Sequence, residues 1–457
     1  MIVKYACTGD DTMYRDLTRG PISRSLILFA LPMMAGNLLQ QFYNIADTLI
    51  VGRVLGANAL AAVGSAYTLM TFLTSIFLGL SMGSGALFSI FRGRGDEAAL
   101  RSGIAHAFAL IMLITLALNA AVYAFLEPIL TFLRVPDAVI GGMRTYLLAI
   151  FAGLIATSLY NYLACLLRAL GNSAAPLIFL AVSALLNVGL DLLFVAALDM
   201  GIAGAAWATV IAQYVSGVGL LLYVLAKCKD ILPKRNDLRY NRTMLRQIVS
   251  MSSLTCAQQS VMNFGILMVQ GLVNSFGPTV MAAFAAAVKI DSFAYLPVQD
   301  FGNAYSTFVA QNYGAGDTAR IREGTRRAFA LSMGFALVIS ALVFALASPL
   351  MRAFVGENEA AVVAAGAKYL RIEGAFYCGI ACLFLLYGYF RAVCRPAMSV
   401  VLTVISLGTR VALAYALAVP FGEVGVWMSI PIGWALADAF GLIQMRRGSE
   451  NAARVKA

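Results

Sequence analysis

Charged residues are scarce in this chain of 457 residues, at 12% of the total, against about 25% in soluble domains. Histidine occurs only once, as His106, so we do not expect a proton relay through histidines at membrane depth. The glycine pattern Gly93-x-Gly95 is too short for a phosphate-binding Walker A loop, which leaves ATP hydrolysis without support. The low charge therefore disfavours a soluble protein, and the missing loop disfavours an ATP-driven one.

Cysteine shows no pattern typical of a disulfide framework or a metal site. The cysteines are scattered over apolar runs and basic segments, and Cys378 and Cys382 share a helix face without a histidine partner. We therefore expect no disulfides and no thiolate-bound metal. The seven cysteines are Cys7, Cys165, Cys228, Cys256, Cys378, Cys382 and Cys394.

Apolar residues dominate what remains: 61% of the chain is hydrophobic and the mean hydropathy is +0.83. Runs such as Ala105–Phe125 and Phe329–Ala347 are continuously apolar, which favours membrane helices of about 20 residues over the alternating strands of a barrel. No cleavable signal peptide is expected, because the first twenty-odd residues are mixed polar. We predict an all-α integral membrane protein with twelve spans, at about 25–50, 60–84, 103–126, 142–165, 176–197, 203–226, 247–272, 280–306, 327–349, 366–390, 397–419 and 424–445.

The net charge of +11 would suggest a nucleic-acid partner in a soluble protein. Here most of the 33 Lys and Arg residues fall in segments on one side of the predicted spans, for example in the linker Lys227–Arg246. The positive-inside rule then places both termini in the cytoplasm of a bacterial-type plasma membrane. We expect no nucleic acid, and contact with membrane lipid as a secondary effect of this charge.

The two halves of the chain resemble each other. Arg92–Gly103 and Tyr313–Gly324 share several identities at a constant shift, as from Gly95 to Gly316, which is 221 residues. An even number of spans per half makes the repeats parallel, as in transporters that rock around a midplane site; a purely structural duplication is the alternative. The predicted parts are a cytoplasmic tail (1–24), a first lobe (25–226), a basic cytoplasmic linker (227–246), a second lobe (247–446) and a cytoplasmic tail (447–457).

Two aspartates lie within predicted spans of the first half, where a carboxylate costs roughly 2.5 to 3.5 kcal/mol on insertion scales. Asp47 shares a helix face with Tyr43, and Asp191 shares one with Asn187, while Thr209 lies near the middle of the sixth span. Carboxylate, amide and hydroxyl oxygens suit a hard cation such as Na⁺, and two close carboxylates could instead share a proton. These residue types do not distinguish Na⁺ from H⁺ as the ion that binds here. The alternatives are a solvated Asp47 at the outer interface and an Asp191 paired for packing.

The acidic pattern is not duplicated, because Asp47 corresponds to Met268, and Asp191 to Ala412 or Ala414. The second half has its own intramembrane charges, which we interpret as partners for other helices, as contacts for a substrate, or as structural groups. These are Lys289, Asp291, Asp300 and Arg410. Further polar candidates beside the first-half site are Tyr43, Asn44 and Asn161.

Several motifs in this order resemble the multidrug and toxic compound extrusion (MATE) family, over about Pro21 to Arg447. They are Leu31-Pro32, Asn44–Thr48 followed by Val51-Gly52, Leu167–Asn172, Gly201–Ala206 and Gln311–Asp317. The resemblance implies an antiporter, without a cofactor, that exports organic cations or amphipathic drugs while Na⁺ or H⁺ enters; we expect a monomer.

Within that family the chain resembles the DinF-like branch, whose cation site lies in the first lobe. The resemblance assigns the site to Asp47, Asn187, Asp191 and Thr209, with Tyr43, Asn44 and Asn161 as neighbours. The NorM-like branch uses acids of the second lobe, where Glu373 is the only loose equivalent here. Two other functions stay open: a flippase for lipid-linked saccharides or peptidoglycan precursors, and a membrane receptor or scaffold that does not transport.

Overall fold

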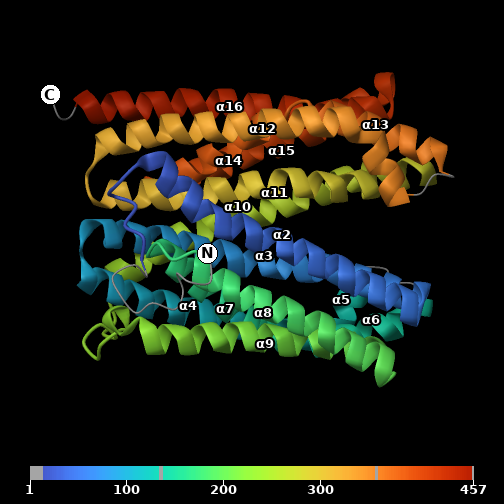
Figure 1. The fold of residues 1–457 in the computed structure, drawn as a ribbon, viewed down its shortest axis with the longest axis horizontal. Helices are drawn as coiled ribbons and strands as arrows, with labels where there is room; N and C mark the ends of the chain where they lie inside the picture. Colours follow the sequence, from blue (N-terminus) through green and yellow to red (C-terminus); the bar gives the residue numbers. More distant parts are fainter. Residues whose placement is uncertain (1–13, 133–136, 356–358, 455–457) are drawn as a thin grey trace. The chain divides into compact units, whose positions relative to one another are not determined.

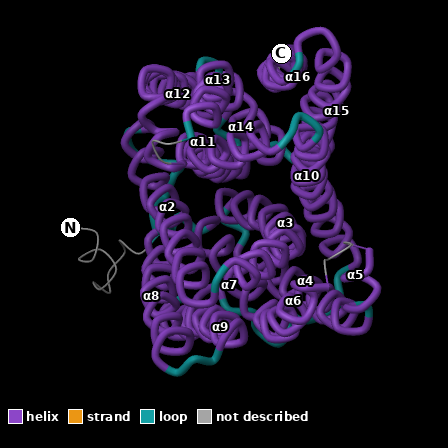
Figure 2. The backbone as a smooth tube through the Cα atoms, turned by 90° about the vertical axis from the view of Figure 1, so that its right-hand side faces the viewer, coloured by secondary structure: helices purple, strands orange, loops and turns teal. Residues whose placement is uncertain are grey.

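The computed structural model describes residues 14–132, 137–355 and 359–454, so Cys7 lies outside the described residues. Helices and short loops account for this described part, in which no strand occurs (Figure 1; Figure 2). The prediction of an all-helical chain is confirmed.

The described chain forms two compact units. The first contains Leu31–Cys256 together with the described residues up to Asp16, and the second contains Leu17–Ala30 and the residues from Ala257 onward. Two long helices, α2 (Ile22–Leu55) and α10 (Arg242–Asn274), therefore contribute residues to both units. Between them lie α3 (Ala57–Arg94), α4 (Glu97–Ala124), α5 (Leu126–Phe132), α6 (Asp137–Ile150), the 3₁₀ turn Phe151–Gly153, α7 (Leu154–Ala169), α8 (Ala174–Asp191), the π-helix η2 (Leu192–Ala197), α9 (Gly201–Lys227) and the 3₁₀ turn η3 (Lys229–Ile231).

The rest of the second unit consists of six helices. They are α11 (Pro278–Gly314), α12 (Thr318–Val355), α13 (Ala360–Gly374), α14 (Tyr377–Ala392), α15 (Pro396–Phe421) and α16 (Glu423–Arg454). The pair α13 and α14 is bent by 51° at its short break, so the predicted span 366–390 is a broken one.

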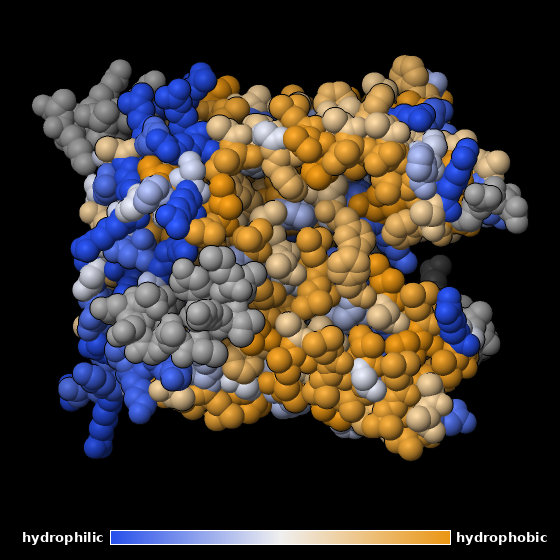
Figure 3. All heavy atoms as spheres, in the orientation of Figure 1, coloured by the Kyte–Doolittle hydropathy of each residue, from blue (hydrophilic) through white to orange (hydrophobic). Residues whose placement is uncertain are grey.

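Among the described residues, ten helices are long and apolar enough to cross a membrane, or eleven if the bent pair is one span. The remaining predicted span, 247–272, lies in α10, which has 33 residues but carries many hydroxyl and amide side chains. Side chains on the outer faces of the helices are apolar, and Leu113, Leu185 and Val419 are 66%, 74% and 90% exposed. Hydrophilic residues gather toward helix ends (Figure 3). Such a surface suits lipid, and the chain is a multi-pass membrane protein.

The duplicated glycine–aspartate motif ends one helix and begins the next in both units. Gly95 and Gly316 have φ of +72° and +75°, the left-handed conformation that terminates α3 and follows α11. Asp96 then accepts a hydrogen bond from the Ala99 N–H at 2.9 Å, and Asp317 accepts one from the Arg320 N–H at 2.8 Å. The identities between the halves thus mark the same helix-capping turn.

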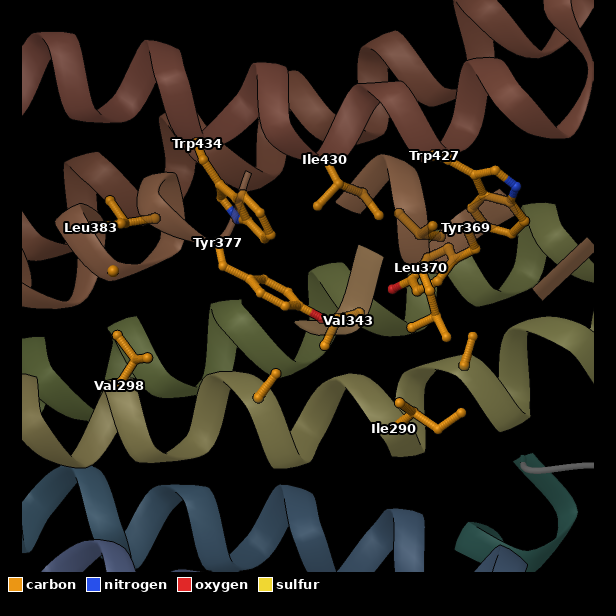
Figure 4. Packing of buried hydrophobic residues seen from close by; sticks show 14 of the residues in the cluster. Ile290, Val298, Val343, Tyr369, Leu370, Tyr377, Leu383, Trp427, Ile430 and Trp434 are labelled. Atoms are coloured by element: carbon orange, nitrogen blue, oxygen red, sulfur yellow. The ribbon is translucent and has the colours of Figure 1, made fainter. Parts of the chain in front are cut away.

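Aromatic side chains dominate the core of the second unit. The Phe284 ring stacks on Trp427 with centroids 5.3 Å apart, and the Tyr369 ring meets Trp427 edge-on at 4.9 Å. Figure 4 shows Trp427 and Trp434 projecting from α16 toward Tyr369 and Tyr377. Phe88, Tyr162 and Phe151 are among the fully buried rings of the first unit. These contacts fill each unit with rigid side chains of large area.

Gly171 follows α7 with φ of +94° and packs against the segment before α2. The Arg15 N–H donates a hydrogen bond of 3.3 Å to the Gly171 carbonyl. A β-carbon on residue 171 would lie 2.1 Å from the Arg15 carbonyl oxygen, which is a backbone atom and cannot move aside alone. Only glycine fits both the backbone angle and this approach.

We therefore expect Gly171→Ala to lower the thermal stability of the purified protein by clearly more than Gly95→Ala. The control position has a similar positive φ but open space around it, so it carries only the backbone strain of about 1–2 kcal/mol. Melting temperatures followed by fluorescence size-exclusion chromatography would measure both variants. Equal melting temperatures would show that the contact with Arg15 does not constrain residue 171.

Candidate functional site

Asp191 lies at the junction of α8 and the π-helix η2 and is fully buried. A π-helix widens the turn by one residue, and such turns are frequent at functional sites. Neither carboxyl oxygen of Asp191 receives a hydrogen bond from a donor in the described part of the chain. A buried carboxylate without a donor is expensive, so this position needs a proton or a cation.

Asn187 is buried one turn before Asp191 on the same face of α8. Its Nδ2 donates to the Thr209 hydroxyl at 3.3 Å, which leaves the Asn187 Oδ1 without a donor from the described residues. The Thr209 hydroxyl donates to the Ala205 carbonyl at 3.1 Å. The structure therefore brings Asn187 and Thr209 together, with an oxygen of each available to a ligand.

Asp47 comes from α2, and its carboxyl group interacts directly with that of Asp191. One of its oxygens, Oδ1, is buried without a donor from the described residues. Two carboxylates can hydrogen-bond to each other only through a proton on one of them, so their approach itself requires a proton or a cation. Unsatisfied oxygens of Asp47, Asp191 and Asn187 form an all-oxygen set, which fits Na⁺ as well as H⁺.

Tyrosines accompany this carboxyl pair. Tyr43 of α2 interacts electrostatically with Asp47, and Tyr146 of α6 interacts electrostatically with both Asp47 and Asp191. Tyr146 is 7% exposed. Sequence reasoning missed it, because a single tyrosine in an apolar helix has no pattern that distinguishes it from a packing residue.

The other predicted neighbours make local contacts. The Asn161 Nδ2 donates to the Thr157 carbonyl of its own helix at 2.9 Å, and the Asn44 carbonyl accepts from the Thr48 hydroxyl at 2.7 Å. Both residues are partly exposed. Their role beside the cation site stays a prediction.

A second group of buried charges lies in the second unit. Asp291 of α11 accepts a hydrogen bond of 2.5 Å from the Tyr377 hydroxyl of α14. Glu373 of α13, only 4% exposed, interacts with Asp291, with the Tyr369 hydroxyl and with Arg410 of α15. Asp291 thus has a donor within the protein, unlike Asp191, whereas the Glu373 Oε2 has no partner among the described residues.

The sequence named Asp291, Glu373 and Arg410 singly but did not show that they interact, because they lie on different helices far apart in the chain. Lys289 is exposed, whereas Asp300 is buried. A further buried carboxyl group, on Asp438 of α16, interacts with Cys382 of α14. Asp438 lies in an apolar run without a polar companion at helical spacing, so nothing in the sequence singled it out.

Comparison with known proteins decides the family. A model of the MatE family matches this chain twice, over residues 32–193 and 254–416. The chain belongs to the MatE family. The double match of this MatE protein coincides with its internal repeat, and the predicted membership is confirmed; the DinF-like branch stays a prediction.

Relatives of this MatE protein cover nearly its whole length. It is 30% identical to the probable multidrug resistance protein YpnP of Bacillus subtilis (strain 168), over 95% of this chain and 97% of that protein. It is 24% identical to the probable multidrug resistance protein NorM of Thermotoga maritima, over 90% and 89% of the two chains. Its fold matches the outward-facing conformation of a multidrug resistance MATE family transporter of the MOP superfamily, with TM-score 0.90, 20% identity, and 95% and 97% of the chains covered.

Removal of the Tyr377 hydroxyl tests the second group of charges. We expect Tyr377→Phe to reduce the free energy of unfolding by about 1–3 kcal/mol, because Asp291 then loses its donor in a buried site. Tyr415→Phe, at a tyrosine 52% exposed on α15, is the matched control and should leave the melting temperature unchanged. A Tyr377→Phe protein as stable as the parent would contradict this role for the hydroxyl.

Proposed function

We propose that this protein is a cation-coupled antiporter that exports organic cations or amphipathic drugs as Na⁺ or H⁺ enters. The observation that supports it most is the pair of half-buried Asp47 and fully buried Asp191, in which the Asp47 Oδ1 and both Asp191 oxygens have no donor among the described residues. A structural carboxyl pair would be expected to have such donors, as Asp291 does. The membrane is a bacterial-type plasma membrane with both termini in the cytoplasm.

The coupling ion binds at Asp47, Asn187, Asp191 and Thr209. When bound, it neutralises the repulsion between the two carboxylates. Asn187 holds Thr209 in position through its Nδ2, so that the Asn187 Oδ1 and the carboxylates remain directed to the ion. Ion binding thereby stabilises the arrangement in which α2 brings Asp47 to α8.

Alternating access follows if substrate and ion favour different arrangements of α2. This helix contributes Leu31–Leu55 to the first unit and Ile22–Ala30 to the second. A displacement of Asp47 is therefore passed along one continuous helix that contains Pro32, where a backbone hydrogen bond is missing. Ion binding on the outside would weaken substrate binding, and substrate from the inside would favour the reverse change.

Export of drug-like compounds is supported by the relatives, two of which are named as probable multidrug resistance proteins. A flippase for lipid-linked saccharides would need several buried cations for a pyrophosphate group. In the described residues Lys289 is exposed and Arg410 interacts with Glu373 and Asp291. This arrangement makes the flippase the weaker candidate.

Dye efflux from proteoliposomes, driven separately by Na⁺ and by pH gradients, tests the coupling site. We expect Asp47→Asn and Asp191→Asn each to reduce gradient-driven efflux at least about tenfold, as for the loss of about 1.4 kcal/mol in the coupled step. Each amide keeps the size of the side chain but removes the charge that binds the ion. Asp199→Asn, at an exposed aspartate with φ of +48°, is the matched control and should transport normally.

Folding of each variant would be checked by its melting temperature. Unchanged coupled efflux in both amide variants would contradict the proposed site. If Glu373→Gln alone abolished coupling, the ion would act at the second group of charges instead. Failure of a folded parent protein to transport any dye under either gradient would favour the flippase.

A further inference from the structure

His106, the only histidine of the chain, lies in α4 and takes no part in the proposed cation site. Its ring is 9% exposed and contacts two backbone groups. The Nδ1 atom lies 2.8 Å from the Ser102 carbonyl oxygen, and the Nε2 atom lies 3.0 Å from the Asn241 nitrogen. The second contact reaches the segment that precedes α10.

These two partners define the protonation of the ring. A carbonyl oxygen only accepts, so Nδ1 carries a hydrogen and donates to Ser102. A backbone N–H only donates, so Nε2 has no hydrogen and accepts from Asn241. The bond from Asn241 therefore needs the neutral imidazole, whereas the bond to the Ser102 carbonyl forms with either the neutral or the protonated ring. A second proton would put an N–H of His106 against the N–H of Asn241.

Asn241 is the residue immediately before α10 and caps that helix. Its side-chain Oδ1 accepts from the Met244 N–H at 3.1 Å, and its carbonyl accepts from the Leu245 N–H at 2.9 Å. The first turns of α10 then pack within the first unit, where the Ser252 hydroxyl donates to the Leu80 carbonyl at 2.9 Å. His106 thus anchors the capping residue of a long helix.

Several charged side chains lie on the helix that carries His106 and on the elements packed against it. On α4, Arg101 pairs with Glu97 at 3.3 Å and with Asp237 of the linker at 3.1 Å. The Lys234 N–H, with a further contribution from Arg101, holds the pKa of Asp237 below its ordinary value. This ion pair therefore persists while an imidazole titrates. The other charged and tyrosine side chains on the linker and on the neighbouring α3 and α7 are Lys227, Lys229, Asp230, Lys234, Arg235, Arg239, Tyr240, Arg242, Arg246, Tyr67, Arg92, Arg94, Tyr160, Tyr162 and Arg168.

The second unit holds the corresponding segment in a different way. Gly20, which precedes α2, corresponds to Asn241 at the repeat shift of 221 residues. Arg320 donates to the carbonyls of Leu17, Arg19 and Gly20 at 3.3, 2.8 and 3.0 Å. A guanidinium stays charged at every physiological pH, whereas an imidazole ordinarily changes its charge between about pH 5 and 8. Only one of the two anchors can respond to protons.

We propose that His106 is a proton-sensitive latch on the start of α10. The neutral ring holds Asn241, and protonation releases it and loosens the first turns of the helix. With the basic segments in the cytoplasm, the latch responds to the cytoplasmic pH. Acidification of the cytoplasm then affects transport through His106, separately from any proton that binds at the coupling site. The latch does not depend on the role of Asp47 and Asp191.

Hydrogen–deuterium exchange of the full-length protein in nanodiscs, corrected for intrinsic exchange, tests the latch at about pH 8 and about pH 5.5, on either side of imidazole titration. In the parent protein we expect protection of residues 241–246 to fall about two- to tenfold at the lower pH, as for the loss of one hydrogen bond. Residues 17–20, held by Arg320, are the internal control and should not change.

Two variants separate the latch from a general effect of acid. His106→Gln keeps an acceptor but cannot take up a proton, so its protection at 241–246 should be the same at both pH values. His106→Leu should show low protection at both. A parent protein that keeps its protection in acid, or a His106→Gln variant that loses it equally, would overturn the proposal.

The variant that carries both Asp47→Asn and Asp191→Asn tests independence from the cation site. Its exchange at 241–246 should respond to pH as in the parent protein. Loss of the response there would show that the coupling carboxyls, and not His106, are the sensor. Failure of the latch would leave the proposed antiport intact, because coupled efflux is measured separately.

Discussion

The burial of carboxyl oxygens away from water is the constraint that governs both the Asp47–Asp191 pair and the group around Asp291. Each buried oxygen needs a hydrogen-bond donor, a bound cation or a proton of its own. The second unit meets part of this need internally, because the Tyr377 hydroxyl donates to Asp291, although the Glu373 Oε2 has no partner among the described residues. The first unit leaves it unmet, since Asp191 is fully buried with no donor among the described residues. The difference between Asp291 and Asp191 supports the proposal that the first unit binds the coupling ion.

The two halves share one helical scaffold, but they carry different residues at the buried charged sites and at the segments before α2 and α10. The glycine–aspartate turns after α3 and α11 have matching backbone angles and matching caps. Each half also anchors the segment before the first helix of the other half, one through Arg320 and the other through His106. The two halves thus share the capping chemistry, but their acidic residues differ, with Asp47 and Asp191 in one half and Asp291 and Glu373 in the other.

Much of this could be predicted from the sequence, because lipid imposes long apolar helices and the repeat recurs at a nearly constant shift. The helical class and the internal repeat followed from those patterns, and the family followed from the resemblance of several motifs. Contacts between distant helices did not: Tyr146 and Asp438 have no polar companion at helical spacing, and Glu373 of α13 interacts with Asp291 of α11, which lies far away in the sequence. The π-helix after Asp191 was also beyond prediction, since Leu192–Ala197 is an ordinary apolar run. Local periodicity identifies a helix face, but not the side chains opposite it.

The central claim is that Asp47 and Asp191 bind the coupling ion directly, as one site. Infrared difference spectroscopy of the purified protein measures this binding without any transport, because a protonated carboxyl group has a C=O stretch that a carboxylate lacks. On acidification, or on removal of Na⁺ at constant pH, we expect a protonated carboxyl band that is weakened or shifted in Asp47→Asn and in Asp191→Asn and absent from the variant that carries both substitutions. The same band, with unchanged intensity in both variants, would contradict the account.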